Sequence, residues 1–140
     1  MTTSTGQLVR DAMLPDPHAL DADASSQEAG EALMRPEVRA VLVVDGGKLV
    51  GVITRKTLVR EVVAPGRDPR TTKLRDIAEP PNATIDSATP LGEAFAFLEE
   101  QDYERVPVVE NGKLVGVLSR SVVQRRLAED EPLPLVDELS

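Results

Sequence analysis

Residues 106–120, which read VPVVENGKLVGVLSR, decide the fold of this chain because residues 41–55 repeat them as VLVVDGGKLVGVITR. Ten of the fifteen aligned pairs are identical, and the alignment needs no gap. The same repeat register, which places Val41 over Val106, continues outside this block, where for example Leu33 aligns with Leu98. Self-similarity at one fixed period is the mark of a duplicated structural unit. The chain is therefore predicted to contain two copies of one fold.

Each copy is predicted to form a β-α-β-β-α unit. Ser25 and Glu28 have the spacing of a capping box at the start of a helix. Gly46-Gly47 and Asn111-Gly112 separate β-branched runs, and such pairs suit two-residue hairpins because glycine and asparagine tolerate positive φ. Besides the hairpins, we expect strands over 19–21 and 83–86 and helices over 26–34, 55–63, 90–100 and 120–128.

The fold class that follows is α+β, with the two repeats packed about a pseudo-two-fold axis. A single unit of about 55 residues would be marginally stable alone, so the copies are expected to bury their apolar strands against each other. The expected boundaries are a first repeat over 8–63, a linker over 64–72 and a second repeat over 73–128. The acidic tail over 129–140 is expected to be disordered.

Composition and charge argue against several classes of function. Hydrophobic residues make up 41% of the chain and aromatic residues 2%, so the core must be aliphatic. The net charge of -8 and the absence of a basic patch argue against general nucleic-acid binding. The chain has no cysteine, no long apolar run and a polar start, which predict a cytoplasmic protein without membrane insertion. No catalytic or metal-binding constellation is apparent, and His18 is interpreted as an exposed loop residue.

The duplicated pattern resembles the cystathionine-β-synthase-type (CBS) domain, and the tandem resembles a CBS pair, or Bateman module. The resemblance covers about residues 8–128. It implies a regulatory module that has no catalytic activity, needs no cofactor, often forms homodimers and signals to a partner protein. It also implies an adenosine-containing ligand, either AMP, ADP, ATP or S-adenosylmethionine, in the cleft between the repeats.

The two junctions between a hairpin and the following helix are candidate phosphate sites. Thr54-Arg55 and Ser119-Arg120 each place a hydroxyl and a cation at the start of a helix. A helix N-terminus offers unpaired N–H groups and partial positive charge, which favour an anion. The alternative is that both arginines are solvated or paired with surface carboxylates.

The resemblance also implies a nucleotide motif, G-h-h-[ST]-x-x-[DN], whose last residue holds both ribose hydroxyls. This chain has Thr57 and Val122 at that position. Loss of such a charged hydrogen bond costs about 1.5–3 kcal/mol, or roughly ten- to a hundredfold in affinity. Because only Thr57 retains a hydroxyl, a single occupied site would be the one around Thr54 and Thr57. The alternative function is a dimerisation or protein-interaction scaffold whose ligand sites have decayed.

By the register of the family, a base pocket would be formed by the first short strand of each copy and the residues before each hairpin. Arg39 and Arg105 could pair there with phosphate, or else form surface salt bridges. The candidate ligand-binding residues are Leu20, Arg39, Ala40, Val41, Ile53, Thr54, Arg55, Thr57, Thr84, Ile85, Arg105, Val106, Pro107, Leu118, Ser119 and Arg120.

Overall fold

The computed structural model describes residues 6–15 and 17–130, so the predicted tail lies outside the described residues from 131 onward. The first half contains α1 (Val9–Ala12), β1 (Ala19–Asp21), α2 (Ser26–Leu33), β2 (Val41–Asp45), β3 (Lys48–Ile53) and α3 (Arg55–Leu58), which continues as a π-helix, η2 (Val59–Val63). The second half contains α4 (Leu74–Ile77), β4 (Ile85–Asp86), α5 (Leu91–Gln101), β5 (Arg105–Glu110), β6 (Lys113–Ser119) and α6 (Arg120–Asp130). This duplicated order confirms the α+β fold predicted from the repeat.

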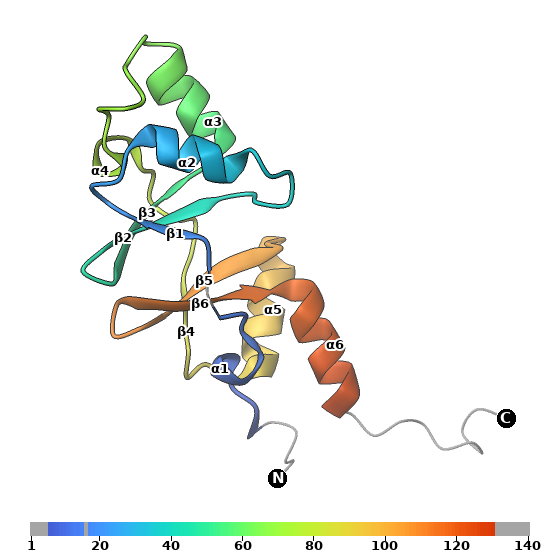
Figure 1. Cartoon of the computed structure of the whole chain (residues 1–140). Coiled ribbons are helices and arrows are strands. Elements are labelled where there is room, and N and C mark those ends of the chain that lie inside the picture. Colours follow the sequence, from blue (N-terminus) through green and yellow to red (C-terminus); the bar gives the residue numbers. More distant parts are fainter. Residues whose placement is uncertain (1–5, 16, 131–140) are drawn as a thin grey trace, which may run out of the picture.

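The strands follow the order β1-β2-β3-β6-β5-β4, which is symmetric about its centre. In each half the short first strand runs parallel to the next one, and the hairpin strands are antiparallel. The halves meet at the hairpin ends, where Lys48 pairs with Lys113. Figure 1 shows α2 and α3 on the outer side of the first three strands and α5 and α6 on the outer side of the last three.

Local geometry follows the predicted turns and caps closely. Gly46, Gly47, Asn111 and Gly112 all have positive φ, as a two-residue hairpin of type I′ requires. The capping box at the start of α2 is present, with the Glu28 amide donating to Ser25 Oγ at 3.2 Å and the Ser25 amide donating to the Glu28 carboxylate at 3.1 Å.

Several elements differ from their predicted form or bounds. The last helix, α6, continues to Asp130, two residues into the predicted tail, and the strand predicted over 83–86 is limited to Ile85 and Asp86. The helix predicted from Pro90 begins at Leu91, because Pro90 has a ψ of 139° and acts as the N-cap. The helix predicted over 55–63 is α-helical only to Leu58 and then widens into η2.

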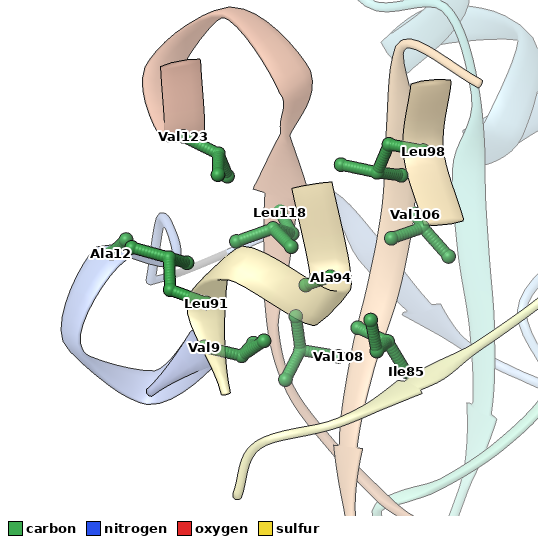
Figure 2. Packing of buried hydrophobic residues seen from close by; sticks show 10 residues of the cluster. All are labelled: Val9, Ala12, Ile85, Leu91, Ala94, Leu98, Val106, Val108, Leu118 and Val123. Carbon is green, nitrogen blue, oxygen red and sulfur yellow. The ribbon is translucent and has the colours of Figure 1, made fainter. Parts of the chain in front are cut away.

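The short lead helix of each repeat packs in the core of the other repeat. Val9 and Ala12 of α1 lie in one aliphatic cluster with Leu91, Leu118 and other residues of the second half (Figure 2). In the same way, Leu74 and Ile77 of α4 complete the cluster of the first half. Each repeat therefore contributes one helix to a core that is otherwise built from its partner repeat.

Backbone pairing fixes this exchange of lead segments. Leu14, just after α1, exchanges hydrogen bonds with Val117 of β6 at 2.8 and 3.0 Å. Glu79, just after α4, pairs with Val52 of β3 in the same way, at 3.0 and 2.8 Å. The two bridges occupy equivalent positions in the repeat register, so the exchange obeys the internal symmetry.

The exchange explains two glycines of the repeated motif. A Cβ at Gly51 would lie 2.6 Å from the Cβ of Ala78 and 3.1 Å from the carbonyl oxygen of Glu79. A Cβ at Gly116 would lie 2.8 Å from both the carbonyl oxygen of Leu14 and the Sδ of Met13. Any side chain at these positions would push the exchanged segment away from the sheet.

We predict that Gly51→Ala lowers the free energy of unfolding by about 1–3 kcal/mol, because the added methyl group overpacks the contact with the lead segment. Urea denaturation followed by circular dichroism measures the change. Gly92→Ala is the matched control, since nothing lies within 4 Å of the added Cβ and alanine favours the helix. A Gly51→Ala variant as stable as the wild type would show that close approach is not required.

Candidate functional site between the repeats

A cavity of about 430 Å³ lies between the two halves and is lined by residues of both. Its walls are the segments before β1, β2, β4 and β5, together with parts of β2, β3, β5 and β6. Clefts of this size, with mostly apolar walls and a few polar groups, are typical of small-molecule sites. The apolar part of the wall includes Leu42, Val52 and Val117.

Six of the sixteen predicted site residues line this cavity, and they come from both repeats. Four of the other ten (Val41, Ile53, Ile85 and Leu118) are buried in the two aliphatic cores. Leu20 packs against the first core, and Thr84 is exposed away from the cavity wall. The six lining residues are Arg39, Ala40, Thr54, Arg105, Val106 and Pro107. The remaining four predicted residues do not line the cavity and are Arg55, Thr57, Ser119 and Arg120.

Arg39 and Arg105 give the cavity its positive charge. Both side chains are exposed, and neither forms an ion pair within residues 6–15 and 17–130. Glu37 is the one acidic residue among the described residues that line the cavity. An unpaired guanidinium at a cleft is suited to binding a phosphate or carboxylate in a bidentate manner.

Sequence reasoning missed several lining residues, among them His18 and Tyr103. His18 is exposed, as expected for a loop, but its loop forms part of the wall. His18 and Ala83 are equivalent in the repeat register and both line the cavity, so this part of the wall obeys the internal symmetry.

The two junction arginines bind the chain itself. The guanidinium of Arg55 donates to the carbonyl oxygens of Leu33 and Arg35 at 2.5 and 2.8 Å, at the end of α2. Arg120 pairs with Asp102 at 3.2 Å and with Glu104, just after α5, and these carboxylates raise the pKa of Arg120. Each arginine thus holds the start of one helix against the end of the preceding one.

Thr54 lines the cavity and belongs to a polar network that crosses between the repeats. The Thr54 amide donates to Thr57 Oγ1 at 3.0 Å, and the two hydroxyl groups lie 3.0 Å apart. The Thr57 side chain is completely buried, and its hydroxyl donates to Glu79 Oε2 at 2.6 Å. Arg60 of η2 donates to the same oxygen at 2.6 Å. The Thr57 hydroxyl and then Arg60 lower the pKa of Glu79.

The equivalent junction of the second repeat lacks this network. Ser119 is buried and its hydroxyl lies 3.1 Å from that of Ser121. Val122 stands where Thr57 is, and Leu14 stands where Glu79 is. The two junctions are related by the internal symmetry but differ in chemistry. Thr57 and Glu79 place polar and charged groups at the first, whereas Val122 and Leu14 place apolar side chains at the second.

Comparison with known proteins identifies the class of this duplicated fold. The sequence matches the CBS domain over residues 9–64 and again over residues 74–129. The chain therefore belongs to the CBS domain family and contains two CBS domains in tandem. This confirms the resemblance drawn from the repeated motif.

The relatives include hypoxic response protein 1 of Mycobacterium tuberculosis, 29% identical over 85 residues that cover 61% of this chain and 59% of that protein. The chain spans 41% and 59% of the lengths of the first curated relatives that it matches. The crystal structure of CBSX2 from Arabidopsis thaliana in complex with AMP superposes with a TM-score of 0.69, at 27% identity, and covers 89% of this chain and 98% of that one.

A zinc-containing structure is also similar in fold. Hypoxic response protein I with two coordinated zinc ions superposes with a TM-score of 0.70, at 22% identity, covering 85% of this chain and 98% of that one. Within the described part of this chain, no three His, Cys, Asp or Glu side chains gather in a way that could hold a metal ion. Nor is any helix in that part long and apolar enough to cross a membrane.

We predict that the stabilising contribution of Glu79 disappears in acid. Because its pKa is lower in the folded protein, the contribution is present above the unfolded pKa and is lost as the pH falls through the folded value. The difference in unfolding free energy between the wild type and Glu79→Gln should be constant near neutrality and shrink below roughly pH 5. Urea titrations at pH 7, 5, 4 and 3 measure it, and parallel stability profiles would contradict the prediction.

Proposed function

We propose that the chain is a regulatory CBS pair that binds an adenosine-containing ligand in the cleft between its repeats and signals to a partner protein. It performs no catalytic step of its own and requires no cofactor in this role. The observation that carries the proposal is the placement of Arg39 and Arg105, two guanidinium groups without ion-pair partners among the described residues, in the wall of one cavity.

The walls offer complementary surfaces to the parts of a nucleotide. Leu42, Val52 and Val117 present an apolar surface to a base, and the two arginines present charge to a phosphate group. The AMP complex of CBSX2, at 27% identity, supports this choice of ligand class. AMP, ADP, ATP and S-adenosylmethionine all share the adenosine that such a cleft would recognise.

The position of the cleft supports a signalling role. Because both repeats line the cavity, a bound ligand contacts both halves of the molecule. A ligand shifts a conformational equilibrium by the difference in its affinity for the two states. A change in how the halves pack would in turn alter the outer helices that a partner can contact.

Isothermal titration with AMP, ADP, ATP and S-adenosylmethionine tests the proposal. At least one should bind, and Arg39→Ala and Arg105→Ala should each weaken that binding about tenfold or more, because each removes a charge-assisted hydrogen bond. Arg10→Ala is the matched control, since Arg10 is exposed on α1 outside the cavity. No binding by any of the four at millimolar concentration would contradict the proposal.

The second candidate function is a dimerisation scaffold, and a specific surface favours it. The apolar side chains of Met34, Val59 and Val63 are exposed by 79%, 58% and 69%. Met34 and Val63 border a hollow of about 460 Å³ on the outer side of the first repeat, and none of its lining residues also lines the ligand cleft. A second copy of the chain would cover this surface in a homodimer. Homodimerisation and a cytoplasmic location stay predictions from the sequence.

For this scaffold we predict that Val63→Glu converts a dimer into a monomer in sedimentation velocity experiments at micromolar concentration, because it places a charge in the apolar contact. Val50→Glu is the control, because Val50 is 48% exposed on β3, away from that hollow. A scaffold without ligand sites would show the same dissociation with and without nucleotide. A wild-type monomer that binds nucleotide would contradict the scaffold function.

A further inference from the structure

We propose that Glu79 recognises the sugar hydroxyls of the ligand, and that each chain consequently binds a single nucleotide with its sugar on the Thr54 side of the cleft. This inference rests on the proposed function and names the residue that gives the site its selectivity. It assigns to a residue of the second repeat's lead segment a role beside Thr54, which belongs to the first repeat.

Glu79 does not itself line the cavity, but its backbone is fixed to a strand that does. It pairs with Val52, which lines the cavity, through hydrogen bonds of 2.8 and 3.0 Å. Two residues further along the chain, Pro81 also lines the cavity. The Glu79 side chain is 43% exposed, so its carboxylate is accessible from solvent and does not belong to the closed core.

One oxygen of this carboxylate is hydrogen-bonded within the protein, and the other is available to a ligand. Oε2 accepts hydrogen bonds from Thr57 and Arg60, both at 2.6 Å, which fix the orientation of the group. Oε1 accepts no hydrogen bond from any group in residues 6–15 and 17–130. A carboxylate oxygen accepts hydrogen bonds only, and hydroxyl groups of a sugar are donors of the kind that it binds.

Thr57 cannot bind the sugar hydroxyls itself. Its hydroxyl donates to Glu79 and accepts from both the amide and the hydroxyl of Thr54, and its side chain is completely buried. The hydroxyl is therefore saturated by the protein and is out of reach of a ligand. Its effect is to position the carboxylate that lies next to it.

The internal symmetry limits this recognition to one half of the cleft. In the repeat register, Leu14 takes the place of Glu79 and Val122 takes the place of Thr57. Leu14 is bonded to β6 as Glu79 is bonded to β3, so the backbone is the same on both sides and only the side chains differ. The equivalent positions of the other half offer no acceptor for a sugar, which leaves one complete site per chain.

Titration calorimetry with AMP and 2′-deoxy-AMP tests the inference on the wild type, Glu79→Gln and Glu61→Gln. The wild type should bind one AMP per chain and prefer it about tenfold over the deoxy analogue, which lacks one charge-assisted hydrogen bond. Glu79→Gln should weaken AMP binding about ten- to a hundredfold and abolish the preference. Glu61→Gln, which removes the other carboxylate bonded to Arg60, should keep both.

The outcomes separate the two proposals. A wild type that binds AMP without preferring it over the deoxy analogue, or that binds two AMP per chain, overturns the role of Glu79 alone. A Glu79→Gln variant that binds both ligands more weakly but keeps their ratio also overturns it, since a merely structural loss has that signature. A wild type that binds no AMP overturns both this inference and AMP as the ligand of the proposed function.

Discussion

The exchange of lead helices is the constraint on which the rest of this structure depends. Each half completes its aliphatic core with a helix that belongs to the other half in sequence. The chain reaches that position only because Gly51 and Gly116 leave room for the backbone of the incoming segment. The crossing segments then become walls of the central cavity, so the same contact that closes the cores also builds the cleft.

The cleft illustrates how a symmetric backbone can carry an asymmetric site. Gene duplication supplies two equivalent strand-to-helix junctions, and in both of them the arginine holds helix ends together. What differs is a pair of side chains: the exchanged segment brings Glu79 to one junction and Leu14 to the other, and the helix there carries Thr57 or Val122. Selectivity in such a module can therefore change through two side chains while the backbone stays constant.

Much of this architecture could be predicted from the repeat, because hairpin turns and helix caps are local. The glycine and asparagine turns and the Ser25 cap needed only neighbouring residues, and the family register brought Arg39 and Arg105 to one cavity. The exchange of lead helices could not be predicted, since helices of four residues do not encode which core receives them. For the same reason the close contacts of Gly51 and Gly116 could not be predicted, nor could the bond between Thr57 and Glu79, which are distant in sequence.

The lead-helix exchange also affects how the protein can be made. The first core needs Leu74 and Ile77, so a nascent chain that ends in the linker cannot complete it, however long synthesis pauses there. The helix that the second core needs, α1, has already been synthesised when the strands of the second repeat emerge from the ribosome. Translation proceeds at about 5–20 residues per second, and domains usually fold in order from the N-terminus. Here neither half can complete its core before the lead helix of the other half has been synthesised. A truncated first repeat would therefore expose an incomplete core to the proteases of the cell.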